Sequence, residues 1–84
     1  MERLLIEEKV REILSSQLSI SAIEIREDSL IGGDLGADSL DTAEIAMMIK
    51  DEFGHDLTDQ QIINIKTVKD IIDILSSSSE EVEK

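Results

Sequence analysis

The chain has 84 residues, enough for one small domain, because below about 100 residues there is rarely enough apolar volume for two cores. Its formal charge of −12 disfavours binding to nucleic acid and to anionic membrane surfaces, and it favours partner proteins with basic patches. The sequence contains no cysteine, which excludes disulfides, thiolate metal sites and thiol nucleophiles.

The first elements expected along the chain are an amphipathic helix and a long ordered loop. Over residues 3–18 apolar residues recur at helical spacing, namely Ile6, Val10, Ile13, Leu14 and Leu18. Residues 19–37 show no sustained period and contain three of the four glycines. Some of the apolar residues in that segment can pack beneath it, which predicts an ordered connection. These residues are Ile20, Ile23, Ile25, Leu30 and Leu35.

A second helix is predicted between Asp38 and Gly54. Asp38 suits the N-cap position, which places Asp41 at the third helical position, and both carboxylates match the positive end of the helix dipole. Gly54 supplies the stop at the other end. The broad apolar side of this helix consists of Leu40, Ala43, Ile45, Ala46, Ile49 and Phe53.

Two more helix starts follow. Thr58 and Gln61 form a capping-box pattern, which predicts a short helix through Ile62, Ile63 and Ile65. Thr67 and Asp70 predict the start of a last helix, whose apolar residues are Val68, Ile71, Ile72 and Leu75. We expect a folded domain at 1–75 and a flexible acidic, serine-rich tail at 76–84. The predicted fold is all-α, a four-helix bundle of three longer helices and one short helix, with the long loop between the first two.

Serine-based catalysis is excluded by the residues available. His55 is the single histidine, and it follows Ser39 by sixteen residues, beyond the far end of the same predicted helix. At ~1.5 Å per residue the separation is about 24 Å, far outside hydrogen-bonding reach. His55 is better explained as a residue near a helix C-terminus, where partial positive charge is favourable. We therefore predict no enzymatic activity.

A calcium-binding loop is also excluded. Counting Asp34 as the first position puts Ser39 at the sixth, where the sharp-turn glycine belongs, and Ile45 at the twelfth, where the bidentate glutamate belongs. We predict no specific metal site, while weak binding of divalent cations by clustered carboxylates stays open.

The most distinctive string is Asp-Leu-Gly-Ala-Asp-Ser-Leu-Asp at residues 34–41. It places Ser39 at the first position of a helix with its hydroxyl accessible, although ordinary helix capping alone explains an Asp-Ser pair. The string resembles the attachment motif of acyl carrier proteins of the free-standing, fatty-acid-synthesis type. Length, acidity and helix order extend the resemblance to about residues 3–75, an acyl carrier domain. It implies that a phosphopantetheinyl transferase moves 4′-phosphopantetheine from coenzyme A onto Ser39, where the arm holds acyl intermediates as thioesters.

The resemblance also implies that the helix after Ser39 is the docking face for partner enzymes. From Asp34 to Asp59 there are eight acids against one base, Lys50. The negative electrostatic field of these acids attracts the basic patches of acyl-transferring and fatty acid synthesis enzymes and raises association rates. Met47 offers an apolar contact, although core filling is the alternative for Met47 and more so for Met48. By position, the partner-binding residues are Asp38, Leu40, Asp41, Glu44 and Met47, with Asp51, Leu57 and Asp59 at the margins.

Many members of that family shelter the acyl chain between helices, and here Ala43 and Ala46 would leave room for it. The sequence departs from the family pattern at Lys50, at Gln60-Gln61 and at Ile62-Ile63. These departures leave open a specialised carrier, or one for polyketide or aminoacyl groups. The alternative from another class is a small acidic adaptor that binds basic proteins or divalent cations without a prosthetic group.

We expect a cytoplasmic monomer. No run approaches the ~20 apolar residues of a membrane span. The first eight residues lack the apolar block of a signal peptide and the acid-poor, arginine-rich pattern of a transit peptide.

Overall fold

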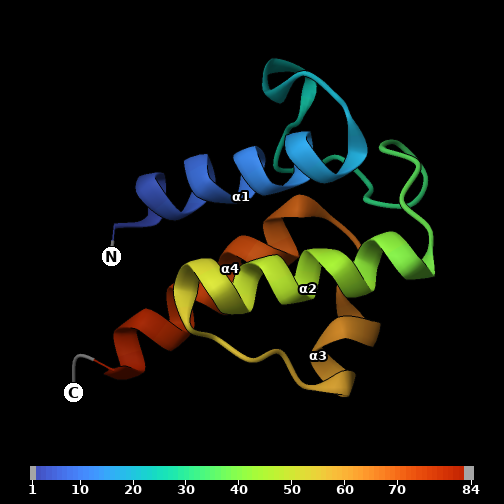
Figure 1. Ribbon diagram of the computed structural model, residues 1–84. Coiled ribbons are helices and arrows are strands. Elements are labelled where there is room, and N and C mark those ends of the chain that lie inside the picture. The colour runs from blue at the N-terminus through green and yellow to red at the C-terminus, as the bar shows by residue number, and fades with distance from the viewer. Residues whose placement is uncertain (1, 83–84) are drawn as a thin grey trace.

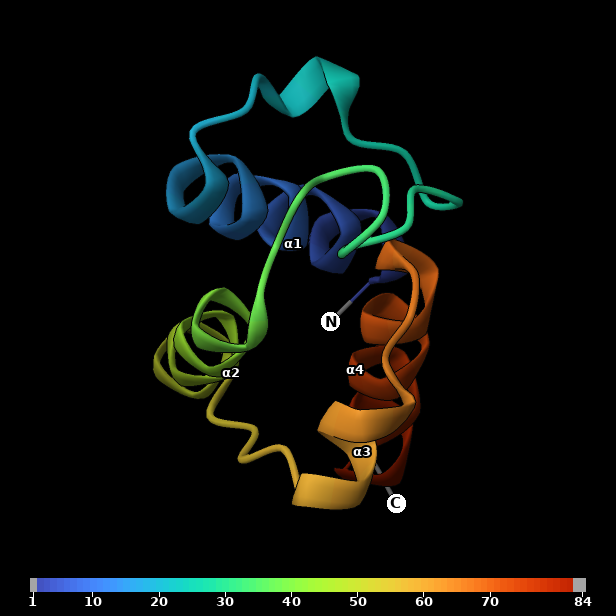
Figure 2. The same ribbon diagram turned by 90° about the vertical axis from the view of Figure 1, so that its right-hand side faces the viewer.

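Helix α1 (Arg3–Leu18) packs against both other long helices, α2 (Ser39–Phe53) and α4 (Val68–Val82). The computed structural model describes residues 2–82, and their side chains as far as Ser77. Figure 1 shows the bundle with α1 above α2, and the view in Figure 2 places α2 and α4 on opposite sides beneath α1. The fourth helix, α3 (Asp59–Asn64), is short. The predicted all-α bundle of three longer helices and one short helix is confirmed.

The connection between α1 and α2 is ordered by backbone hydrogen bonds, as predicted. It contains a short 3-10 helix, η1 (Ala22–Glu24), and its later part is tied to the start of α4. The amide of Val68 donates to the carbonyl of Ser29 at 3.1 Å, and Leu30 forms an isolated antiparallel bridge with Thr67. The end of the loop is therefore fixed against the segment that precedes α4.

The caps predicted for the later helices are present as hydrogen bonds. Thr58 and Gln61 exchange side-chain-to-backbone bonds of 3.0 and 3.1 Å at the start of α3. Thr67 and Asp70 do the same at the start of α4, at 2.9 and 3.3 Å. Gly54 ends α2 with φ of 69°, a left-handed conformation that costs glycine little. The short segment from Gly54 to Thr58 thus joins two well-defined helix ends.

Helix α4 extends beyond its apolar repeat. The sequence predicts that the folded domain ends at residue 75, but the helix continues to Val82. Neither glycine nor proline follows Leu75, so nothing in the backbone stops the helix there. The side chains of 78–82 and residues 83–84 lie outside the described part of the structure, so the division into a domain at 1–75 and a tail at 76–84 stays a prediction.

The core is aliphatic and draws on every long helix. Ile31 belongs to it at 5% exposure although the sequence pattern did not single it out, whereas Ile23 is 89% exposed. No helix within residues 2–82 has both the length and the hydropathy that a membrane span requires. The buried residues are Ile6, Val10, Ile13, Leu14, Ile25, Ile31, Ile45, Ile49, Leu57, Val68, Ile71, Ile72 and Leu75.

The predicted apolar side of α2 is only partly buried. Ile45 and Ile49 lie in the core, but Leu40 is 69% exposed and Ala43 is also exposed. A helix at the edge of a small bundle buries only the stripe that faces its neighbours, and the remaining apolar residues face solvent. The apolar side of α2 is therefore divided between the core and the surface.

Candidate functional site

Ser39 is the first residue of α2 and is exposed. A reciprocal capping box fixes this helix start, as predicted. The carboxylate of Asp38 accepts from the amide of Asp41 at 2.9 Å, and the carboxylate of Asp41 accepts from the amide of Asp38 at 3.2 Å. Because the capping box fixes the backbone on both sides of Ser39, its hydroxyl projects from a defined position at the helix start.

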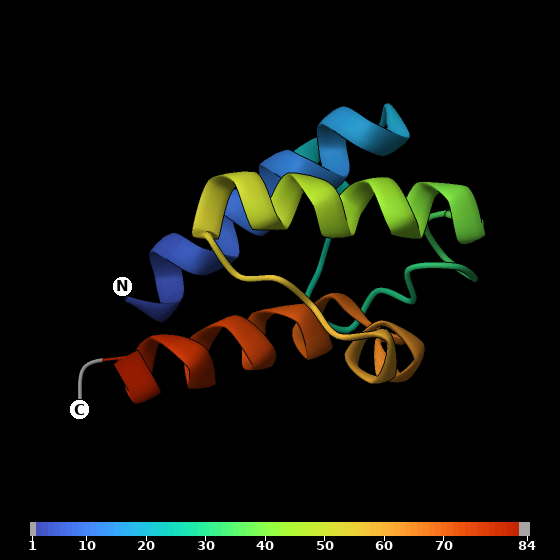
Figure 3. The ribbon, with the colours of Figure 1, turned by 60° about the horizontal axis from the view of Figure 1, so that its bottom comes forward.

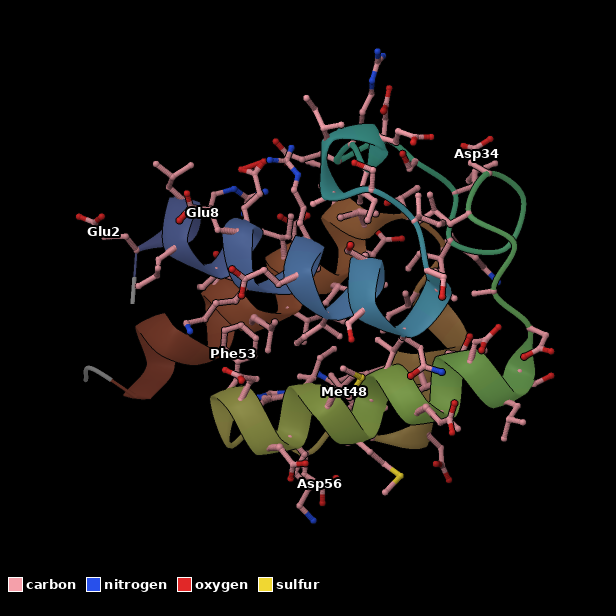
Figure 4. The ribbon with its side chains drawn as sticks, turned by 45° about the horizontal axis from the view of Figure 1, so that its top comes forward. Glu2, Glu8, Asp34, Met48, Phe53 and Asp56 are labelled. Atoms are coloured by element: carbon pink, nitrogen blue, oxygen red, sulfur yellow. The ribbon has the colours of Figure 1, made fainter. Side chains whose placement is uncertain are left out.

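The loop before Ser39 is folded back on itself. The amide of Ala37 donates to the carbonyl of Ile31 at 3.0 Å, and Gly36 turns the chain with φ of 77°. The carboxylate of Asp34 accepts from the amide of Leu30 at 2.7 Å. Asp34 therefore helps to hold the loop in its folded form, and Figure 4 shows it at the outer edge of this turn.

A groove of about 370 Å³ opens beside Ser39. One wall is the folded loop, and another is the segment before α4, which contributes Ile65 and Lys66. Gly32 and Gly33 present no side chain to the groove. An exposed serine and a wall that includes two glycines fit an extended group attached to Ser39. The remaining lining residues are Leu30, Ile31, Ala37, Asp38 and Thr42.

The site contains no arrangement for catalysis by Ser39. His55 follows the C-cap of α2, and the fifteen residues of that helix at 1.5 Å each separate it from Ser39 by about 22 Å. Among the side chains that the structure describes, as far as Ser77, no three His, Cys, Asp or Glu residues are grouped so that they could hold a metal ion.

Most of the residues predicted to bind partners lie on α2, at its N-cap or at the start of α3, and we call this set the docking surface. Five of them are exposed on α2 or at its N-cap, and Asp59 is exposed at the start of α3. Asp41 is half-buried because it serves the capping box. Leu57 is only 8% exposed, so its assignment to the margin of this surface is corrected to the core. The five exposed residues are Asp38, Leu40, Glu44, Met47 and Asp51.

One residue beside the docking surface, Gln17 at the end of α1, is not indicated by any sequence pattern. Its side-chain amide donates to the carboxylate of Asp41 at 3.4 Å and also to that of Glu44. These residues are 24 and 27 positions apart in the chain, and no local pattern links residues at that separation. The contact could be found only once the packing of α1 on α2 was known.

A second groove, of about 450 Å³, lies between α2 and α3. Figures 1 and 3 show the connection after α2 running back along that helix, so that α3 lies beneath the half that begins at Ser39. Ala43 and Ala46 line this groove, as does the buried Leu57. Lys50 and Asp56 form an ion pair of 3.7 Å at its rim. The other lining residues are Met47, Asp51 and Ile62.

The two methionines of α2 have different environments. Met47 is 68% exposed on the docking surface. Met48 is partly buried and packs against the core, and Figure 4 shows it directed toward the interior of the bundle. Core filling therefore applies to Met48 and not to Met47.

Residues 8–75 match the model of the protein family described as "Phosphopantetheine attachment site". That span includes the capped start of α2, both grooves and the apolar part of α4. Proteins of this family are non-catalytic carriers that bear 4′-phosphopantetheine covalently and interact with phosphopantetheinyl transferases and with the enzymes of their pathway. The match covers most of the chain, and the chain belongs to the phosphopantetheine-attachment family of carrier proteins.

Proposed function

We propose that Ser39 is the attachment residue and that the chain carries fatty acyl groups in fatty acid synthesis or a related pathway. The observation that carries the first part is the position of Ser39, exposed at the capped start of α2 and on the edge of a groove. The family match favours this carrier over an acidic adaptor without a prosthetic group. When bound, the arm supplies a terminal thiol for thioesters, which a chain without cysteine lacks.

In the chemical step of loading, this chain supplies only the hydroxyl of Ser39. The oxygen of Ser39 forms a bond to the phosphorus of coenzyme A that bears the pantetheine. The bond from that phosphorus to the bridging oxygen of the diphosphate breaks, and adenosine 3′,5′-bisphosphate leaves. A base on the transferase takes the hydroxyl proton, because Ser39 has no histidine within reach.

The docking surface supports a carrier that visits several enzymes. Its exposed carboxylates steer basic partners toward Ser39, while Leu40 and Met47, 69% and 68% exposed, add apolar contacts. Electrostatic steering raises association rates without requiring a tight complex, which suits a protein that must leave each partner.

The groove between α2 and α3 supports an aliphatic cargo. Its volume lies within the range of about 300–1,000 Å³ typical of small-molecule pockets. Ala43 and Ala46 leave space, and Leu57 and Ile62 add apolar walls. An acyl chain placed there would be removed from water, which is favourable by about 0.8 kcal/mol per buried CH₂. A fatty acyl group fits such a site better than a polar aminoacyl group.

Intact-mass spectrometry tests the attachment. The purified chain is incubated with coenzyme A and a phosphopantetheinyl transferase, beside Ser39→Ala and Ser16→Ala variants. Ser16 is an exposed serine on α1 and controls for the loss of a hydroxyl. We expect the wild type and Ser16→Ala to gain one phosphopantetheinyl group and Ser39→Ala to gain none. Labelling of Ser39→Ala, or an unchanged mass of the wild type, overturns the proposal.

NMR spectra of the chain loaded from an octanoyl coenzyme A test the cargo site. We expect methyl resonances of Ala46 and Ile62 to move between the unacylated and acylated forms. An Ala46→Phe variant should reduce those changes by filling the groove. Changes confined to the neighbourhood of Ser39 would show that the acyl chain stays in solvent.

A further inference from the structure

We propose that Lys66 binds the phosphodiester that joins the arm to Ser39. The inference rests on the proposed function, because it requires the group to be on Ser39. It assigns a role to a residue that neither the sequence motif nor the docking surface includes.

Lys66 and Ser39 line the same groove from different segments of the chain. Ser39 begins α2, whereas Lys66 lies just before α4. Both backbone polar groups of Lys66, the carbonyl and the amide, form hydrogen bonds. Its carbonyl accepts from the amide of Ile31 at 3.0 Å, and its amide donates to the carboxylate of Asp70 at 2.8 Å. The backbone of the lysine is therefore anchored in the groove wall, and the residue is exposed.

The phosphodiester would meet an unfavourable local charge without Lys66. The start of a helix attracts anions, but here Asp38 and Asp41 already occupy it with two carboxylates. Asp38 also lines the groove. A third anion on Ser39 adds like-charge repulsion, and Lys66 is the one cation among the residues that line this groove.

Lys66 is also available for a new partner. Most other basic side chains of the described residues lie within 4.0 Å of a carboxylate, whereas Lys66 forms no such ion pair with any residue that the structure describes. Its ammonium can therefore pair with a phosphate without first breaking an ion pair. The basic residues already paired are Arg3, Lys9, Arg11, Lys50 and Lys69.

Phosphorus NMR of the loaded chain tests the contact. The phosphodiester does not titrate near neutral pH, so its ³¹P resonance reports the surroundings of the phosphate. Wild type, Lys66→Gln, Lys66→Arg and Lys69→Gln are loaded to completion with excess transferase, as checked by mass. Lys69→Gln is the matched control, because this neighbouring lysine pairs with Asp73 at 3.7 Å and does not line the groove.

We expect the ³¹P resonance to move in Lys66→Gln, to return toward its wild-type position in Lys66→Arg and to stay in place in Lys69→Gln. At low salt, the shift in melting temperature on loading should be about 2–4 °C more positive for the wild type than for Lys66→Gln. About 1 M salt should remove this difference.

An unchanged ³¹P resonance in Lys66→Gln overturns the role of Lys66 while leaving the attachment at Ser39 intact. If the wild type loads and Lys66→Gln does not, Lys66 serves the transferase rather than the arm, and the inference is also wrong. Failure of the wild type to load instead overturns the proposed function, so the two failures are distinguishable.

Discussion

The side-chain amide of Gln17 on α1 donates a hydrogen bond to the carboxylate of Glu44 on α2. The same amide donates to Asp41, so one side chain joins two acids of the docking surface to the neighbouring helix. The hydrogen bonds reduce the repulsion between these carboxylates and set their position relative to Ser39. The end of α1 thereby shapes a surface that otherwise belongs to α2.

Replacing Gln17 tests this link. Gln17→Met keeps the length and helix propensity of the side chain but removes the donor, so the free energy of unfolding should fall by about 0.5 kcal/mol. Gln17→Glu should lower it further by adding like-charge repulsion, and salt should recover part of that loss. Urea denaturation measures both changes. Ser16→Glu adds the same charge one residue away, and an equal loss in that variant would contradict the specific contact.

On α2, substitution of the buried Ile49 should affect stability, whereas substitution of the exposed Met47 should affect docking. Ile49→Ala removes a side chain that is 1% exposed and should lower the free energy of unfolding by about 2–5 kcal/mol. Met47→Ala removes a side chain that is 68% exposed and should change the free energy of unfolding by less than about 0.5 kcal/mol. Met47→Ala should nevertheless raise the KM for loading by the transferase. An unchanged KM would remove Met47 from the docking surface.

If the docking surface steers partners electrostatically, loss of one of its carboxylates should slow loading by the transferase. Glu44→Gln should lower kcat/KM for the transferase several-fold at low salt, and the difference should shrink as salt screens the field. Glu8→Gln removes the same charge from α1, where Figure 4 shows Glu8 well away from α2. Loading rates at several salt concentrations compare the two. Equal losses in both variants would indicate that net charge, rather than the docking surface, controls association.

The cap of α4 predicts a defined dependence of stability on pH. The backbone amide of Thr67, followed by that of Lys66, holds the pKa of Asp70 below its ordinary 3.8. The carboxylate therefore contributes stability that is fully present above pH 3.8 and is lost as the pH falls through the lower, folded-state pKa. Asp70→Ala should lower the free energy of unfolding by about 1 kcal/mol at neutral pH, and by much less once the wild-type carboxyl is protonated.

Thermal or urea unfolding of wild type and Asp70→Ala between neutral and acidic pH measures this dependence. Asp28→Ala controls for the removed charge, since Asp28 is an exposed acid of the α1–α2 loop. A constant difference between wild type and Asp70→Ala across the range would show that the cap acts through side-chain packing and not through its charge.

Local chemistry explains why the helix starts could be predicted. A cap such as Asp38 with Asp41, or Thr58 with Gln61, involves residues three apart, so its hydrogen bonds are encoded in adjacent sequence. The end of α4 could not be placed the same way, because it lacks a breaking residue. Burial at Leu57 depends on how the connection after α2 packs, which no local period describes.

The sequence also predicts those features of the candidate site that local patterns define. The position of Ser39 follows from its cap, and the exposed acids follow from the helical register of α2. Gln17 and Lys66 escaped prediction because each reaches the site from a distant segment that only the tertiary fold brings near. Long-range partners of this kind need a structure, or a substitution experiment, to be found.

Peptide-level mass spectrometry of the chain loaded with coenzyme A and a transferase tests whether Ser39 carries the arm. Fragmentation of the peptide that spans residues 34–50 locates the added group to one residue. We expect a single phosphopantetheinyl group on Ser39, with every other serine unmodified. A group on another serine, or none on a chain that is folded by circular dichroism, would contradict the assignment of Ser39 as the attachment site.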